Sequence, residues 1–299
     1  MKFPMMVAGL GTILNIILDP IFIFDLESLG GFGFGLGIAG AAMATVISQV
    51  VVFIVFIFML FFKNHSYISF NLSDFTFSTD IIWDIIKVGL PASLSMIVMA
   101  VGQGVFNKIL VHISVNTVAA YQVAGRLDML VFLPIFSIAA SLTTLVGMFY
   151  GAKEYGALRY IIKYGIFSAL LITIISSTIV YIFAGHVVRF FTDDASIVII
   201  AVNFLQIFAF AYPFISVGIT TGRVLQGLGK GLPVLIITIV RVLGVSAPLA
   251  LFFVFIMDKT VEWVWYSMML STIVAFGIGL TWLISTLKTL PTSGQSLNN

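Results

Sequence analysis

The stretch Met5–Phe24, MMVAGLGTILNIILDPIFIF, decides the fold class, because its only charged residue is Asp19. Twenty apolar residues are enough for an α-helix to cross the hydrocarbon core of a bilayer. A carboxylate inside such a span costs roughly 2.5–3.5 kcal/mol on insertion scales, and acids kept there usually serve a function. The stretch therefore predicts a transmembrane helix with a functional acid.

Two neighbours of Asp19 support an ion or proton site. Asn15 lies four residues earlier, so its side chain shares one helical face with the acid. Pro20 removes a backbone donor and tends to kink the helix beside the acid. The alternative is a neutral carboxylic acid that is hydrogen-bonded and serves packing alone.

The composition predicts an all-α polytopic membrane protein. The 299 residues are 61% hydrophobic and only 9% charged, whereas a soluble domain has about 25% charged residues. Long apolar runs rather than short alternating segments argue against a transmembrane β-barrel. The lack of cysteine excludes disulfides and thiolate metal sites, and the three histidines are not spaced as metal ligands. No basic cluster suits nucleic acid, and no set of catalytic residues gathers at one depth, so we expect no enzyme.

Eight spans and one long polar connection organise the chain. We interpret the first span as a retained helix rather than a signal peptide. The connection at 63–84 separates a two-helix segment, 1–62, from a six-helix segment, 85–290, which a polar tail follows at 291–299. The predicted spans are 5–24, 35–62, 85–110, 118–149, 160–184, 195–222, 232–257 and 262–287.

The placement of Lys and Arg predicts the orientation. If both termini are cytoplasmic, nine of these residues lie inside, three lie outside, and Arg126 and Arg241 lie within spans. Cytoplasmic loops carry an excess of positive charge, so this orientation is favoured. We expect a multi-pass protein of the cell membrane with both termini cytoplasmic.

Several stretches, taken in order, resemble the multidrug and toxic compound extrusion (MATE) family of secondary transporters. The resemblance covers nearly the whole chain and depends on the order and spacing of the motifs rather than on one of them. The stretches are Leu14–Phe24, Gly37–Thr45, Ala119–Arg126, Leu145–Lys153 and Leu225–Lys230.

The resemblance implies a fold of two six-helix lobes that alternate access to a central cavity. The eight spans would match family helices five to twelve, with no counterpart of the first four. Residues 1–62 would then be an incomplete amino-terminal lobe, 63–84 the connection between lobes, and 85–290 the complete carboxy-terminal lobe. A separate chain that supplies the missing helices is an expected partner, together with the lipid bilayer.

The resemblance also implies the site and the activity. One family branch has an Asn and an Asp four apart on helix five and a Thr on helix six, which match Asn15, Asp19 and Thr45. H⁺ or Na⁺ would bind there as the coupling ion, with no other cofactor. The expected activity is cation-coupled antiport that exports amphipathic organic cations. The acid that another branch carries on helix seven corresponds to Met99, and no acid lies between Ala195 and Met257, so that branch's cation site is not expected.

Other polar residues within spans are candidates for the substrate cavity. Gln103 and Asn107 are four apart, and Asn203 and Gln206 are three apart. The alternative for each pair is interhelical hydrogen bonding, worth about 0.6 kcal/mol on average.

Four further polar residues lie in predicted spans and need an explanation. An interfacial structural role is expected for Gln122, Arg126 and Asp128 near the outer end of span four. Arg241 lies deep in span seven and needs a partner or a water-filled cavity.

Two other functions remain open. One is a truncated, non-transporting remnant or a membrane subunit that depends on a partner, because the first four family helices lack a counterpart. The other is a flippase of related fold for lipid-linked glycans, which the sparse charge of the spans disfavours.

Overall fold

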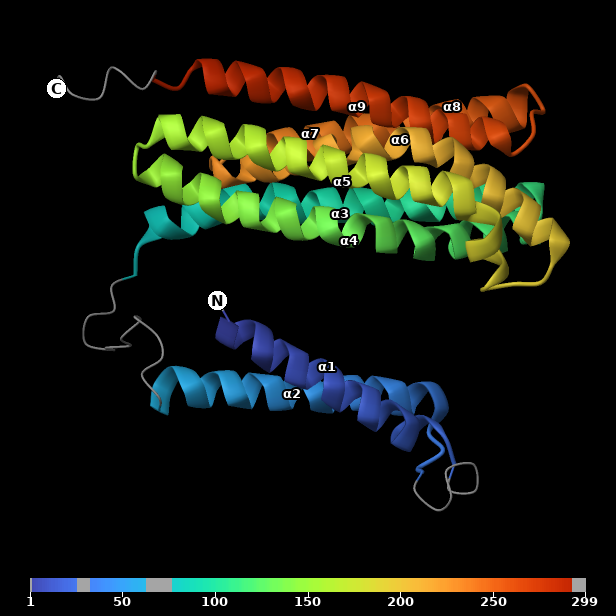
Figure 1. Cartoon of the computed structure of the whole chain (residues 1–299), viewed down its shortest axis with the longest axis horizontal. Coiled ribbons are helices and arrows are strands. Elements are labelled where there is room, and N and C mark those ends of the chain that lie inside the picture. Colours follow the sequence, from blue (N-terminus) through green and yellow to red (C-terminus); the bar gives the residue numbers. More distant parts are fainter. Residues whose placement is uncertain (1, 26–32, 63–76, 292–299) are drawn as a thin grey trace. The chain divides into compact units, whose positions relative to one another are not determined.

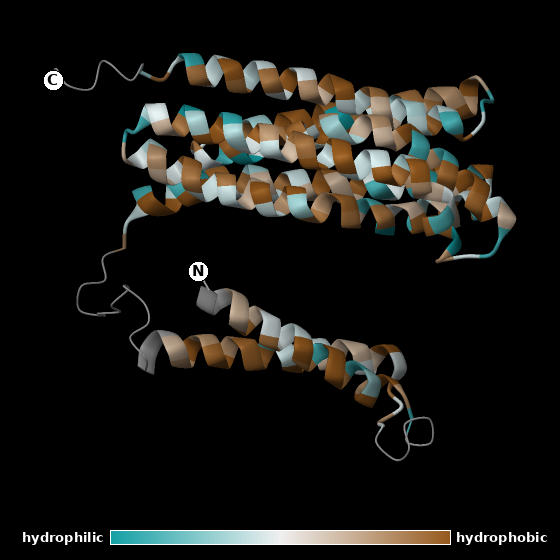
Figure 2. Ribbon diagram, viewed as in Figure 1, coloured by the Kyte–Doolittle hydropathy of each residue, from teal (hydrophilic) through white to brown (hydrophobic). Residues whose placement is uncertain are grey.

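A computed structural model describes residues 2–25, 33–62 and 77–291 of the chain. These residues form helices and short connections, and no strand occurs among them. Within the described ranges, eight helical spans are long and apolar enough to cross a membrane, which agrees with the predicted number. Figure 2 shows hydrophobic residues along the full length of the helices, as a lipid environment requires. The chain divides into two compact units, residues 1–77 and 78–299, and each is described by itself.

The first unit is a hairpin of two helices, α1 (Lys2–Ile23) and α2 (Gly37–Phe62) (Figure 1). Small residues allow the two helices to approach closely. A Cβ added at Gly40 would lie 2.2 Å from the carbonyl oxygen of Phe22, and one added at Gly11 would lie 2.3 Å from a methyl group of Val52. The absence of a side chain at both glycines therefore permits the close packing of α1 and α2.

The second unit is a bundle that contains the other six spans (Figure 1). Helix α6 packs against α4, α5 and α9 and forms the centre of the bundle. Trp265, Tyr212 and Phe204 are the largest fully buried side chains of its core. The helices other than those of span seven are α3 (Thr79–Ile113), α4 (Val115–Gly151), α5 (Tyr155–Arg189), α6 (Ala195–Gly227) and α9 (Glu262–Lys288).

The start of α3 corrects the predicted polar connection. Ser78 caps the helix, because its hydroxyl accepts a hydrogen bond from the backbone N–H of Ile81. Residues 79–84 therefore belong to α3 rather than to a loop. The rest of the predicted connection, 63–76, and the tail from 292 lie outside the described residues.

Span seven consists of alternating α- and π-helical segments: α7 (Leu232–Ile239), η2 (Val240–Ser246), α8 (Ala247–Leu251) and η3 (Phe252–Ile256). The backbone N–H of Ala247 bonds to the carbonyl of Val242, five residues back, as a π-helix requires. Pro248 has no N–H to give to the carbonyl of Gly244, which weakens the α-helical pattern at this point. The widened turn carries Arg241.

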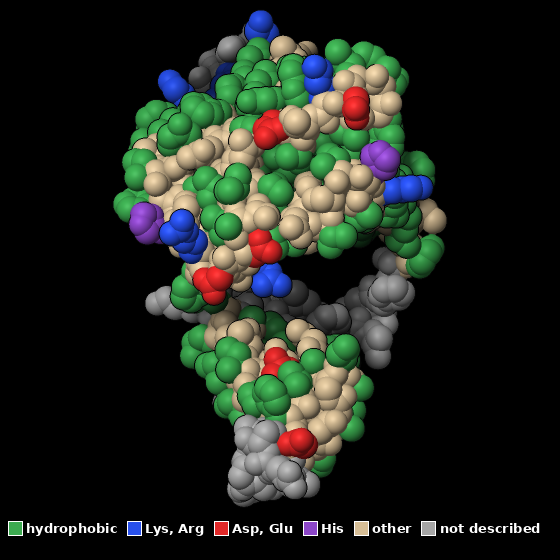
Figure 3. Space-filling model, turned by 90° about the vertical axis from the view of Figure 1, so that its right-hand side faces the viewer, with side chains coloured by type: hydrophobic (Ala, Val, Ile, Leu, Met, Phe, Trp, Pro, Cys, Tyr) green, Lys and Arg blue, Asp and Glu red, His purple; other side chains and the backbone are tan. Residues whose placement is uncertain are grey.

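Charged side chains are sparse on the surface at the end of the second unit. Figure 3 shows them set singly among hydrophobic side chains on this face. This pattern suits the end of a bundle where short loops leave the membrane.

Candidate functional site

The first unit brings together the three residues predicted to bind a coupling ion. The side-chain amide of Asn15 donates to Oδ1 of Asp19 at 3.3 Å and to Oγ1 of Thr45 at 3.5 Å. Thr45 in turn donates to the carbonyl of Ala41 at 3.0 Å, which turns its oxygen lone pairs toward the amide. Helices α1 and α2 thus place one carboxylate, one amide and one hydroxyl around one point. Their role in ion coupling stays a prediction.

Pro20 lies inside α1, directly after Asp19. Because proline has no N–H, the carbonyl of Ile16 lacks its usual helical donor. This leaves a backbone oxygen without its helical bond one turn before the acid. The helix continues through Pro20, since the N–H of Phe24 still bonds to the Pro20 carbonyl at 3.1 Å.

The second unit contains two neighbouring cavities in its bundle. The larger has a volume of about 410 Å³ and the smaller about 200 Å³. Four residues line both of them: Met99, Ile215, Arg241 and Thr272. Arg223 also lines the larger cavity, and the remaining wall of this cavity is mostly apolar.

Arg241 has both the partner and the cavity that its position in a membrane span requires. Its Nη2 donates a hydrogen bond to Sδ of Met99 on α3, at 2.8 Å. Arg241 also lines both of these neighbouring cavities. Met99 therefore offers Arg241 a thioether as its hydrogen-bond acceptor.

The structure places Asp128 elsewhere than at the interface that was expected for it. It lies in the wall of the smaller cavity, and its carboxylate accepts a hydrogen bond from the hydroxyl of Tyr212. One signal in the sequence was overlooked: Tyr121 and Asp128 are seven residues apart, so they share one face of α4. Both line this cavity. Arg126, two residues before Asp128, is exposed.

The side chains of Gln103 and Asn107 on α3 form hydrogen bonds with residues of α4. The hydroxyl of Tyr121 donates to Gln103 at 3.5 Å, and the amide of Gln122 donates to Asn107 at 3.4 Å. Both contacts are interhelical hydrogen bonds, which was the alternative interpretation of this pair. Gln103 also lines the smaller cavity.

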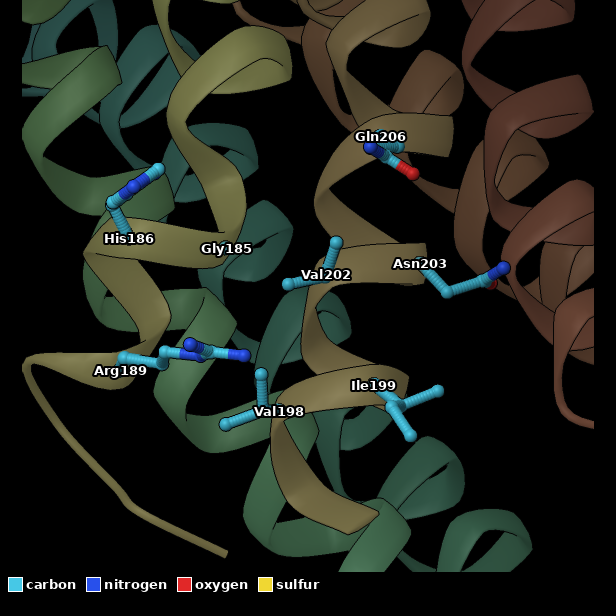
Figure 4. Close-up of a pocket in the computed structure, with 8 residues that line it drawn as sticks. All are labelled: Gly185, His186, Arg189, Val198, Ile199, Val202, Asn203 and Gln206. Atoms are coloured by element: carbon cyan, nitrogen blue, oxygen red, sulfur yellow. The ribbon is translucent and has the colours of Figure 1, made fainter. Parts of the chain in front are cut away.

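Asn203 and Gln206 line a different pocket, an open one of about 530 Å³ between α5 and α6 (Figure 4). Figure 4 shows both side chains pointing away from His186 and Arg189 of α5. The Oδ1 atom of Asn203 is buried and has no hydrogen-bond partner among the described residues. The structure therefore does not bring this pair together with Gln103 and Asn107.

A metal centre is not formed by the part of the chain that the structure describes. No group of three or more His, Cys, Asp or Glu side chains gathers there. The polar groups that do gather are the cluster at Asp19 and the pair of cavities that share Arg241.

Comparisons of the sequence with family models and with individual known proteins agree with each other. The family model described as MatE matches residues 91–252, more than half of the chain. A relative from Thermotoga maritima, "Probable multidrug resistance protein NorM", is 29% identical over 83% of this chain and 52% of its own length. The "Multidrug export protein MepA" of Staphylococcus aureus is 31% identical over 76% of this chain and 48% of its own length. This chain therefore spans about half the length of the relatives that it matches.

A solved structure supports the same relationship. The "Crystal structure of MATE in the straight conformation" superposes with a TM-score of 0.87 at 32% sequence identity. The match covers 96% of this chain and 62% of the solved chain.

Proposed function

Because this chain belongs to the MATE family, we propose that it forms part of a secondary active exporter of amphipathic organic compounds, driven by H⁺ or Na⁺. The observation that carries the proposal is the hydrogen-bonded cluster of Asn15, Asp19 and Thr45, which joins α1 to α2. An acid inside a span is costly to insert, so its presence there points to a function. The proposal assigns transport rather than an enzymatic reaction, in a cell membrane with both termini cytoplasmic.

The chemistry of the cluster supports the binding of either ion. A proton would bind at a carboxylate oxygen of Asp19. For Na⁺, rotation of the Asn15 amide by 180° would direct its oxygen toward Asp19 and Thr45, so that three side-chain oxygens converge. Oxygen ligands are the ones that hard cations prefer. The same three residues thus serve both cases, and Pro20 next to the acid allows α1 to bend when the ion enters or leaves.

The exported compounds follow from the family resemblance, which implies amphipathic organic cations. We also propose that the transporting assembly contains further spans, on this polypeptide or on a partner. The mass of the native protein in mild detergent tests this part. A particle with about four spans beyond the eight described here supports the assembly, and a monodisperse particle of 32.6 kDa plus detergent argues against it.

Transport by the native assembly in proteoliposomes tests the function. An imposed H⁺ or Na⁺ gradient should drive export of a fluorescent organic cation, and Asp19→Asn should abolish the gradient dependence. Asp84→Asn is the matched control, since Asp84 is an exposed acid near the start of α3. Equal gradient-driven transport by the native and Asp19→Asn proteins would remove Asp19 from the mechanism.

A further inference from the structure

The larger cavity of the second unit carries charge of one sign only. Its charged lining residues are Arg223 on α6 and Arg241 on η2. Among the described residues that line it, none is Asp or Glu. Such a wall attracts a negatively charged group and repels a cation.

Arg241 lies in this cavity with little of its bonding capacity used. A guanidinium has five N–H donors in a planar fork that matches a carboxylate or phosphate. The hydrogen bond that Arg241 makes goes to the thioether of Met99, and sulfur is a weak acceptor. Replacement of that contact by a bidentate contact to an anionic group would give a stronger, charge-assisted interaction.

The acid in the wall of the neighbouring, smaller cavity has another partner. Asp128 lines the smaller cavity but not the larger one, and Tyr212 donates a hydrogen bond to it. It therefore does not supply a negative charge to the wall of the larger cavity. Arg223 is similarly oriented by a neutral group, because its Nη1 donates to Oε1 of Gln226 at 3.2 Å.

The remaining wall of the larger cavity fits an apolar body. Three phenylalanines, Phe136, Phe214 and Phe276, come from α4, α6 and α9. Met96 and Met99 add flexible, polarizable contacts from α3. The volume of about 410 Å³ lies within the usual range for small-molecule pockets.

We propose that this cavity binds amphipathic organic anions, with their carboxylate, sulfonate or phosphate group on Arg241 and their apolar body against the phenylalanines. As a statement about the exported substrate it rests on the proposed transport function, and it replaces the organic cation by an anion. As a statement about binding it does not depend on transport.

A pair of probes that differ only in charge tests the proposal. The anionic probe is 11-(dansylamino)undecanoic acid, and the cationic probe has trimethylammonium in place of the carboxylate. Binding to the purified protein in a nonionic detergent is followed by dansyl fluorescence and by displacement with unlabelled undecanoate. We expect the anion to bind about tenfold more tightly than the cation, or better, as a charge-assisted hydrogen bond implies.

Variants assign that preference to the arginine. Arg241→Gln should weaken anion binding about tenfold and leave cation binding unchanged or stronger, while Arg241→Lys should retain part of the affinity. Arg126→Gln is the matched control, because Arg126 lies in a span but lines neither cavity. If Arg241→Gln does not purify as a monodisperse protein, Arg223→Gln in the same cavity should show the weakened binding.

Two results would overturn the proposal: equal or tighter binding of the cationic probe, or unchanged anion binding in the arginine variants. Neither result bears on the proposed transport function, because the transport assay with Asp19→Asn tests that function separately. Conversely, anion binding without gradient-driven export of either the anionic or the cationic probe would retain the site and remove the transport function.

Discussion

The hydroxyl of Tyr212 on α6 donates a hydrogen bond to the carboxylate of Asp128 on α4, in the wall of the smaller cavity. Tyr212 is fully buried, and Phe132 packs edge-on against its ring. The contact joins the two helices with a polar bond inside an apolar core. Each partner satisfies a group that would otherwise be unpaired in the bundle.

The first prediction follows from this pair. Tyr212→Phe should lower the free energy of unfolding by about 1–3 kcal/mol, because it leaves the carboxylate of Asp128 without its donor. Reversible unfolding in SDS, followed by circular dichroism, measures the change. Tyr181→Phe is the control, since Tyr181 lies on an exposed face of α5, and it should change stability little. Equal effects of the two variants would show that the hydrogen bond contributes nothing.

The second prediction concerns the contact between α3 and η2. A Cβ at Gly102 would lie 2.2 Å from a methyl group of Val242, whose branched side chain is stiff. Gly102→Ala should therefore destabilise the second unit by about 1–3 kcal/mol through overpacking. Gly104→Ala, two residues later with open space around it, should be neutral or slightly stabilising.

A double variant checks the cause of that effect. Gly102→Ala with Val242→Ala removes the methyl group that the new Cβ would meet, so it should recover part of the stability. Thermal unfolding in detergent compares the native protein, the two single variants and the double variant. Destabilisation by Gly102→Ala that persists unchanged in the double variant would point away from this contact.

The third prediction concerns the α1–α2 hairpin. Gly40→Ala should separate the helices, because its Cβ would meet the backbone carbonyl of Phe22, which cannot rotate away as a side chain can. We expect a loss of about 1–3 kcal/mol and weaker cross-linking between two cysteines introduced on facing positions of α1 and α2. Gly9→Ala has nothing within 4 Å of its new Cβ and serves as the control. Cross-linking that stays efficient in Gly40→Ala would contradict the close packing.

The fourth prediction concerns the end of α9. Nη2 of Arg159 on α5 donates to the carbonyls of Leu287 at 3.2 Å and Leu290 at 2.9 Å, at the terminus where backbone carbonyls run out of α-helical N–H donors. Arg159→Gln should therefore loosen the last turn. Hydrogen exchange at the amides of Thr289 and Leu290 should become faster, while the middle of α9 stays protected.

Lys163→Gln is the control for this change. Lys163 is exposed one turn later on α5 and loses the same charge. Exchange at the end of α9 should be unaltered in this variant. If both variants accelerate exchange equally, charge rather than the two hydrogen bonds holds the helix end.

Local signals in the sequence were sufficient for the spans and for part of the proposed ion site. Asn15 and Asp19 lie one turn apart on one helix, so their contact follows from spacing alone. Thr45 lies thirty residues further on, and only the family resemblance connected it with them. Span ends were predicted too short, as at α3, because polar residues such as Asp80 and Asp84 continue a helix beyond its apolar core.

The cavities of the second unit depend on contacts that no local pattern encodes. Tyr212 lies eighty-four residues after Asp128, and Met99 lies one hundred and forty-two residues before Arg241. The apolar runs placed each residue in a span but could not tell which helices become neighbours. The π-helical turns were also missed, because their bonding pattern depends on packing around Pro248 as well as on composition.

The π-helical turns give span seven extra residues that its α-helical hydrogen-bond pattern does not need. Each one closes its hydrogen bond over one residue more than an α-helical turn does, as Ala247 with Val242 and Met257 with Phe252 show. If the π-helical turn shifted along the span, the residues that it passes would move by one position in the helix, while both ends of the span stayed in place. Arg241 sits on the first of these turns, so such a shift would redirect its guanidinium between the two cavities that Arg241 lines.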